Sequence, residues 1–275
     1  MKEQKLEFDT IVSYIESLPP LPESVLKIEE LYAHGNPDMR VLSQIIEKDP
    51  VLTADILARV NAPYYGMRKN IVSVMQAVML FGAAQIRGFV LKSLIDQSFS
   101  FDMYPYGLGN AAFQEVSSLQ SDLMFQWYMG VDVGMTRDLI PIAFLMEMGK
   151  IIIAKEVAES EYTEQFPQMI AQDGITQTER FFTDLTSAEI AAMLFEHWNF
   201  NEIFINTMRY LDNMDAAEAK EYLPYIQALD VVRTCVNVSE IMSESSFEAA
   251  KSKVMQYGLP LNHFVHTVER LQKKT

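Results

Sequence analysis

Apolar side chains recur at helical spacing along most of the chain. Ile11, Ile15 and Leu18 lie three or four positions apart, which places them on one face of an α-helix. The same spacing follows from Val25 to Tyr32 and from Val41 to Ile46. No stretch sustains the alternation of apolar and polar residues that a strand with one wet face requires. The pattern predicts an all-α protein with about a dozen helices, most of them short.

Capping and stop signals punctuate these helices. Asp49 is a cap-type residue directly before Pro50, which suits a first helical position, so a helix is expected to begin there. Gly82 and Gly258 are expected to end helices. Three further pairs have the spacing of a capping box: Ser73 with Gln76, Thr176 with Glu179, and Thr186 with Glu189.

One segment interrupts the helical pattern more strongly than any other. Residues 101–110, FDMYPYGLGN, contain a proline and two glycines, which break helical periodicity, and three aromatic residues, which favour packing over free solvation. We therefore expect an N-terminal helical subdomain over residues 1–100, packed on a larger helical subdomain over residues 101–275.

Composition indicates a packed protein in a reducing compartment. Hydrophobic residues make up 49% of the chain, which supports a real core. The apolar runs are much shorter than the roughly 20 residues that a membrane span needs, and the charged N-terminus lacks a signal-peptide core. Cys235 is the only cysteine, so an internal disulfide framework is excluded. No membrane association and a cytoplasmic location are expected.

Charge argues against nucleic acid as a partner. The formal net charge is −15, and the longest basic run is Lys273-Lys274. Binding to phosphate backbones depends on clustered Lys and Arg, and a helix-turn-helix reading of residues 71–92 would offer DNA only Arg87 and Lys92. An acidic surface of this kind favours basic protein partners.

Several motifs, taken in order, resemble one known family. LPPLPESVLKIEEL is followed by IIEKDPVLTADILARVNAPYYG, then by IVSVMQAVMLFGAAQIRGFVL, PIAFLMEMGKIII and SAEIAAMLFEHWNFNEIFINTMRYL. This order is similar to that of the HDOD family, the HD-related output domain of bacterial signalling proteins, over roughly residues 16–213. The family usually has serine where this chain has Ala62. The resemblance implies an all-α fold related to the HD phosphohydrolases, so the larger subdomain is expected to be HD-like.

The resemblance also implies which residues of this chain stand at the positions of the metal ligands of HD enzymes. The adjacent His and Asp ligands correspond to Met146 and Glu147, the later histidines to Ser187 and the pair Leu211-Asp212, and the first histidine to Val116–Ser117. A thioether is a poor ligand for hard divalent cations, and one carboxylate alone gives little affinity. No histidine lies between His34 and His197. We therefore expect no catalytic residues, no bound metal and no cofactor.

The most specific part of the resemblance is the motif that runs from Asp49-Pro50 through Asn61 to Tyr65-Gly66. It allows two interpretations. In the structural reading, Asp49 caps the helix that begins at Pro50, and the amide of Asn61 ties down the turn that contains Tyr65 and Gly66. In the functional reading, Asn61, Tyr65 and Arg68 line a groove for a partner peptide or a small ligand. Asp49, Pro50, Asn61, Tyr65, Gly66 and Arg68 are therefore the candidate binding residues.

Three functional hypotheses follow. The leading one is a non-catalytic bacterial signal-transduction module that contacts regulatory proteins, because a scaffold that keeps its core and loses its chemistry is most simply a binding element. The second is a divergent metal-dependent phosphohydrolase that uses Glu147, Asp212 and other carboxylates. The third is a sensor that binds a small ligand or nucleotide in the vestigial HD cleft.

Overall fold

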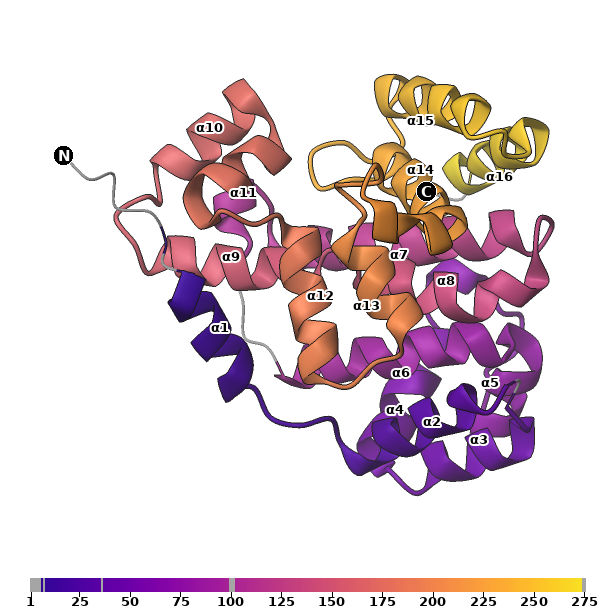
Figure 1. Ribbon diagram of the computed structural model, residues 1–275. Coiled ribbons are helices and arrows are strands. Elements are labelled where there is room, and N and C mark those ends of the chain that lie inside the picture. Colours follow the sequence, from indigo (N-terminus) through magenta and orange to yellow (C-terminus); the bar gives the residue numbers. More distant parts are fainter. Residues whose placement is uncertain (1–5, 7, 36, 99–101, 274–275) are drawn as a thin grey trace.

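The computed structural model describes residues 6, 8–35, 37–98 and 102–273, and this part of the chain is helical throughout (Figure 1). The first eight helices are α1 (Phe8–Ser17), α2 (Glu23–Ala33), α3 (Met39–Glu47), α4 (Pro50–Val60), α5 (Val74–Phe81), α6 (Ala83–Ser98), α7 (Asn110–Tyr128) and α8 (Val133–Leu145). The remaining helices are α9 (Met148–Ala158), α10 (Gln165–Asp173), α11 (Ile175–Thr183), α12 (Ser187–His197), α13 (Glu202–Arg209), α14 (Leu223–Cys235), α15 (Glu244–Gln256) and α16 (Leu261–Gln272). Short 3-10 turns span η1 (Pro63–Tyr65), η2 (Tyr104–Tyr106) and η3 (Ala217–Glu221). Extended pairing in the described residues is limited to an isolated bridge, so the prediction of an all-α fold is confirmed.

Local signals explain many of the helix boundaries. Thr186 and Glu189 form the reciprocal capping box at the start of α12. Gly82, with a φ of 79°, separates α5 from α6, and a break at Glu147 separates α8 from α9. Breaks of this kind give more and shorter helices than the dozen that periodicity predicted.

One predicted cap is wrong. Thr176 does not begin a helix, because α11 already begins at Ile175 after Gly174, whose φ of 85° suits glycine. Glu179 consequently lies in the middle of α11 and is buried, with 1% of its surface exposed. Its carboxylate accepts hydrogen bonds from the Tyr106 hydroxyl and from the Ser187 backbone amide.

The N-terminal helices are joined to the rest of the molecule by a buried arginine. Helices α2–α5 pack around one end of α6 in the lower right of Figure 1, and α6 packs on α8. Arg87 on α6 forms ion pairs with Glu29 on α2 and with Asp138 on α8. Its guanidinium also lies 4.6 Å from the centre of the Tyr32 ring. Arg87 and Lys92 are both buried, so neither side chain is presented to DNA.

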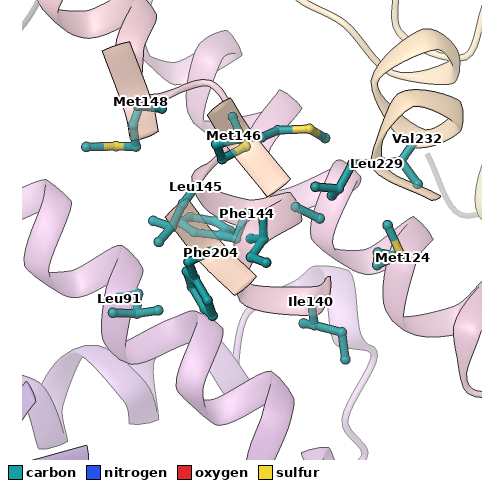
Figure 2. Packing of buried hydrophobic residues seen from close by; sticks show 14 of the residues in the cluster. Leu91, Met124, Ile140, Phe144, Leu145, Met146, Met148, Phe204, Leu229 and Val232 are labelled. Atoms are coloured by element: carbon teal, nitrogen blue, oxygen red, sulfur yellow. The ribbon is translucent and has the colours of Figure 1, made fainter. Parts of the chain in front are cut away.

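Much of the core lies among α6, α7, α8, α9, α12 and α13, with α14 against them, and Figure 2 shows part of this packing. Met146 is buried within it, as are Phe204 and Leu229. The C-terminal helix α16 covers α7, where the rings of Phe264 and Trp127 are 5.0 Å apart. One hydrophobic cluster therefore runs from α1 to α16.

Over residues 102–109 the predicted interruption is the 3-10 turn η2 with short loops on either side, and α7 begins at Asn110. Residues 99–101 lie outside the described part of the chain, so the division between residues 100 and 101 stays a prediction. From residue 102 onward the expected packing is only partial, because Pro105 and Tyr106 in η2 are buried whereas Tyr104 is 57% exposed. No helix in the described ranges has the length and apolarity needed to cross a membrane.

Candidate functional site

The strongest polar centre in the core surrounds Glu147. This residue sits between α8 and α9 and is buried, with 2% of its surface exposed. The Lys150 ammonium lies 2.7 Å from Oε2 of Glu147. Gln120 on α7 donates a hydrogen bond of 2.8 Å from Nε2 to Oε1 of the same carboxylate. The carboxylate that the sequence singled out is therefore neutralised from within the chain.

A glycine allows the next layer of contacts to form. A Cβ on Gly149 would lie 1.9 Å from the carbonyl oxygen of Ser187, so only glycine permits α9 to approach the start of α12 this closely. The close approach lets Lys150 donate a 2.8 Å hydrogen bond to the Ser187 hydroxyl. The backbone amide of Ser187 in turn donates to Glu179, whose carboxylate is 3.6 Å from the Lys150 ammonium and accepts a hydrogen bond from Tyr106.

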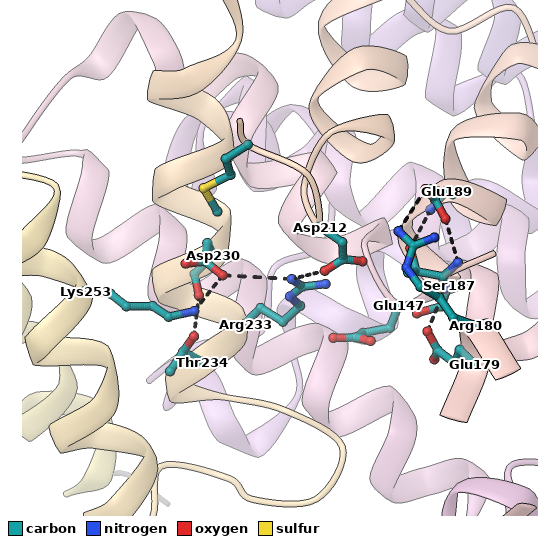
Figure 3. A network of polar contacts seen from close by, with 12 residues as sticks. Glu147, Glu179, Arg180, Ser187, Glu189, Asp212, Asp230, Arg233, Thr234 and Lys253 are labelled. Carbon is teal, nitrogen blue, oxygen red and sulfur yellow. Dashed lines mark hydrogen bonds and ion pairs between the residues drawn. The ribbon is translucent and has the colours of Figure 1, made fainter. Parts of the chain in front are cut away.

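A second ion pair, drawn in Figure 3, continues the network toward the C-terminal helices. Asp212 lies 2.6 Å from Arg233, which projects from α14. Arg233 is also 3.9 Å from Asp230, and Asp230 is held by Lys253 on α15 at 2.8 Å. Each carboxylate of this chain of contacts therefore has a cationic partner.

The electrostatics keep these groups charged. Burial alone would raise the pKa of the Glu147 carboxyl, but the nearby Lys150 ammonium and the hydrogen bonds outweigh it and lower the pKa. Burial likewise opposes the charged form of Lys150, yet Glu147 and Glu179 raise its pKa. Asp212 and Arg233 behave in the same way, with the pKa of the carboxyl lowered and that of the guanidinium raised. Burial beside Glu179 raises the pKa of Tyr106 well above its usual value, so its hydroxyl stays a donor.

The other positions that correspond to HD metal ligands offer no further charge. Met146 and Leu211 are buried apolar side chains, and Val116 and Ser117 are buried on α7. Within residues 6, 8–35, 37–98 and 102–273, no group of three or more His, Cys, Asp or Glu side chains is arranged to hold a metal ion. The residues that are present suit ion pairing and do not suit coordination of a divalent cation.

The candidate residues Asp49 and Pro50 serve the start of α4. The Asp49 carboxylate accepts hydrogen bonds from the amides of Val51 and Leu52, and Pro50 occupies the first helical position. The Ser24 hydroxyl donates to the same carboxylate at 2.8 Å, so the cap also ties α4 to α2. Asp49 and Pro50 border a hollow of about 340 Å³ between these helices.

The rest of the motif forms a clamped turn at the other end of α4. Asn61 donates from Nδ2 to the carbonyls of Leu57 and Ile71 and accepts from the Ile71 amide. Within the turn, Gly66 has a φ of 59°, a conformation that favours glycine.

The side chains of this turn point in different directions. Tyr65 packs edge-on against Phe81 and Phe89 and borders a cavity of about 330 Å³, whereas Arg68 is exposed. The structure therefore does not gather Asn61, Tyr65 and Arg68 into one groove. The side-chain amide of Asn61 is hydrogen-bonded to the backbone of Leu57 and Ile71, and Arg68 does not line the cavity that Tyr65 borders.

Sequence reasoning missed several residues of the Glu147 network. Lys150 lies inside the quoted LMEMGK motif, and its spacing of three from Glu147 on a helix was an available signal. Gln120, Glu179 and Arg233 come from helices far away in the sequence. Their roles depend on tertiary packing, for which the local pattern contains no signal.

The fold and the site together define an all-helical domain with an HD-type architecture and a polar centre built from internal ion pairs. The chain belongs to the HDOD family, because the model of the HDOD domain matches residues 18–214. The predicted resemblance over roughly residues 16–213 is confirmed.

One relative and several solved structures are similar to this chain. A protein of Treponema pallidum described only as uncharacterized is 27% identical over 80% of this chain, and the chain spans 42% of that relative's length. Among solved structures, an HDOD domain protein of unknown function from Geobacter sulfurreducens has a TM-score of 0.63 at 17% identity, with 98% of this chain and 94% of that chain covered. A candidate signal transduction protein from Marinobacter aquaeolei VT8 has a TM-score of 0.68 at 20% identity, covering 100% of this chain and 60% of that one. These two structures support the fold.

Proposed function

We propose that this protein is a non-catalytic, cytoplasmic signal-transduction module that acts through contacts with regulatory proteins. Membership of the HDOD family supports a signalling role. The similar Marinobacter structure is described as that of a signal transduction protein, which points the same way. The absence of long basic runs and the net charge of −15 favour protein partners over nucleic acid.

The observation that carries the proposal is the pairing of Lys150 with Glu147. Hydrolytic metal sites need several oxygen or nitrogen ligands that converge on one point, with a position left for water. Here an ammonium group lies 2.7 Å from the carboxylate that would have to serve as a ligand. A divalent cation at this carboxylate would face strong repulsion from that ammonium in a buried setting.

The second carboxylate in the region is also occupied. Asp212 is paired with Arg233 at 2.6 Å, and arginine does not give up its proton in proteins. Recruiting Glu147 and Asp212 to one metal would require displacing two cations, the buried Lys150 and the half-buried Arg233. The network supports a structural role for these acids and favours a scaffold without hydrolytic chemistry.

Metal content and hydrolysis test the non-catalytic part of the proposal. The full chain should be purified without chelators, analysed for Mn, Fe, Mg and Ni, and assayed with bis(p-nitrophenyl) phosphate and with cyclic dinucleotides. We expect substoichiometric metal and no hydrolysis above that of the Glu147→Gln variant. Stoichiometric metal, with hydrolysis lost in Glu147→Gln and retained in Glu115→Gln, a matched change at an exposed glutamate on α7, would instead establish a divergent phosphohydrolase.

Partner capture tests the contact part. In-cell cross-linking followed by mass spectrometry should identify a regulatory protein that also binds the purified chain in a saturable manner. Tyr65→Ala and Asn61→Ala variants, checked for normal folding, show whether the turn after α4 takes part. Failure to find any partner that binds the purified chain would contradict the proposal.

A further inference from the structure

The cavity beside Tyr65 lies in the seam between the N-terminal helices and the core. It has a volume of about 330 Å³ and is lined by residues of α4, of the turn after α4, of α6 and of α7, together with Phe144 of α8. On α7 it is lined by Ser118 and Asp122, whereas Gln120 faces Glu147. The seam cavity and the Glu147 network therefore lie on different faces of α7. Its volume is at the lower end of the range for small-molecule sites, which often occur where two units meet.

Cationic side chains line one part of the seam cavity. Lys92 on α6 is only 6% exposed, and its ammonium lies 5.2 Å from the centre of the Phe144 ring. Arg59 on α4 also lines the cavity, and Glu115 stands exposed at the rim. A buried ammonium and a guanidinium on one cavity wall suit a small anionic group.

Hydrogen-bond acceptors line another part. Gln85, 3% exposed, lies seven residues before Lys92 on α6, and Asp122 is 5% exposed. Gln85 donates from Nε2 to Oδ1 of Asp122 at 3.2 Å. The other amide atom, Oε1 of Gln85, is buried and accepts no hydrogen bond within the described structure. A buried acceptor without a donor is costly, so this part of the cavity suits a hydrogen-bond donor.

Aromatic rings line the cavity between its cationic part and its acceptor part. Phe89 lies between Gln85 and Lys92 on α6, and Tyr65 and Phe144 border the same cavity. Seven residues along a helix correspond to about 10 Å, so the cationic and acceptor ends are separated by roughly the length of a bicyclic ring with a short chain. Rings of this kind favour stacking or edge contacts with a flat ligand.

We propose that the seam cavity binds a small, ring-bearing organic acid that carries a hydrogen-bond donor at the end opposite its acid group. The acid faces Lys92 and Arg59, the ring lies among Tyr65, Phe89 and Phe144, and the donor faces Asp122 and Gln85. This assignment goes beyond the proposed function because it adds a ligand site that is independent of the Glu147 network.

Saturation-transfer NMR and titration with indole-3-propionate test the site in the full chain. This probe has the acid, the ring and a ring N–H donor, and for a compound of its size we expect a Kd of about 1 mM or tighter. Two matched probes remove one feature each: indole-3-propionamide lacks the charge, and 1-methylindole-3-propionate lacks the donor. Each is expected to bind about tenfold more weakly, because each loses one charge-assisted or buried hydrogen bond.

Paired serine variants locate the binding. Ser118→Trp fills the seam cavity, whereas Ser252→Trp adds the same ring to an exposed site on α15. Both hydroxyls donate to the carbonyl four residues earlier, so the two variants lose the same local bond. Binding should be abolished by Ser118→Trp and kept by Ser252→Trp, and Lys92→Met should weaken the acid without changing the amide. The proposal is overturned if the wild-type chain shows no saturable binding of indole-3-propionate, or if a folded Ser118→Trp variant binds it as the wild type does.

Discussion

Replacing Lys150 with methionine tests the idea that an internal cation holds the Glu147 network together. The ammonium is 2.7 Å from Glu147, 3.6 Å from Glu179 and 2.8 Å from the Ser187 hydroxyl. At an effective dielectric constant of about 20, opposite charges about 4 Å apart attract by about 4 kcal/mol. Methionine matches much of the shape of lysine, so the change removes charge more than volume.

The expected cost comes from the acids left behind. Removing one partner of a buried ion pair usually costs about 3–5 kcal/mol, because the remaining charge is buried without compensation. A typical domain is stable by only about 5–15 kcal/mol, so Lys150→Met should lower the urea midpoint markedly. The matched control is Lys251→Met on α15, whose pair with the exposed Glu248 lies at the surface, and it should cost about 0.5 kcal/mol or less.

Two further measurements distinguish lost charge pairing from general damage. Adding Glu147→Gln to Lys150→Met should restore about 1 kcal/mol or more, because the second change removes the uncompensated acid. The difference between wild type and Lys150→Met should also shrink as the pH falls toward about 4, near the pKa of an unfolded glutamate.

The sign of this pH effect follows from the shift in the pKa of Glu147. In the wild type that pKa is lowered, so its contribution to stability is present above the unfolded pKa and is lost as the pH falls through the folded pKa. Without Lys150, burial would raise the pKa of Glu147 in the folded state. Protonation of Glu147 as the pH falls would then remove much of the stability loss of the Lys150→Met variant. Urea denaturation at several pH values measures both trends. An unchanged midpoint, or a deficit that is independent of pH and of Glu147→Gln, would refute the reasoning.

Three other predictions concern single residues. Gly149→Ala should cost several kcal/mol or prevent folding, since its Cβ would lie 1.9 Å from the backbone of α12. Gly109→Ala, with open space around it, should be close to neutral. Thermal unfolding of the two variants measures both effects. Burial raises the pKa of the Cys235 thiol to about 12, so Ellman's reagent should label it only in denaturant, and rapid labelling of the native chain would contradict its burial. Asn61→Ala should cost about 2 kcal/mol in urea unfolding, because one half-buried amide makes three hydrogen bonds. The exposed Asn213→Ala control should change little.

The sequence was sufficient for the features that depend on neighbouring residues. Asp49 and Thr186 begin helices because each side chain accepts hydrogen bonds from amides two or three residues later, so the signal and its effect lie together. Glu179 shows where this reasoning fails: its spacing from Thr176 fits a cap, but Gly174 begins the helix earlier and the carboxylate is used by Ser187 and Tyr106.

The helices beyond the family match explain why Glu147 and Asp212 remain charged. The HDOD match ends at residue 214, yet Arg233 on α14 neutralises Asp212, and the carbonyl of Val236 accepts a hydrogen bond from Gln120. Gln120 in turn holds Glu147, so the C-terminal segment fixes both acids, one through charge and the other through a shared amide. A buried carboxylate without a metal needs another positive partner or it becomes protonated. In this chain Lys150 provides that partner from within the family motif and Arg233 provides it from outside, which makes residues 215–273 part of the same structural unit as the HDOD domain.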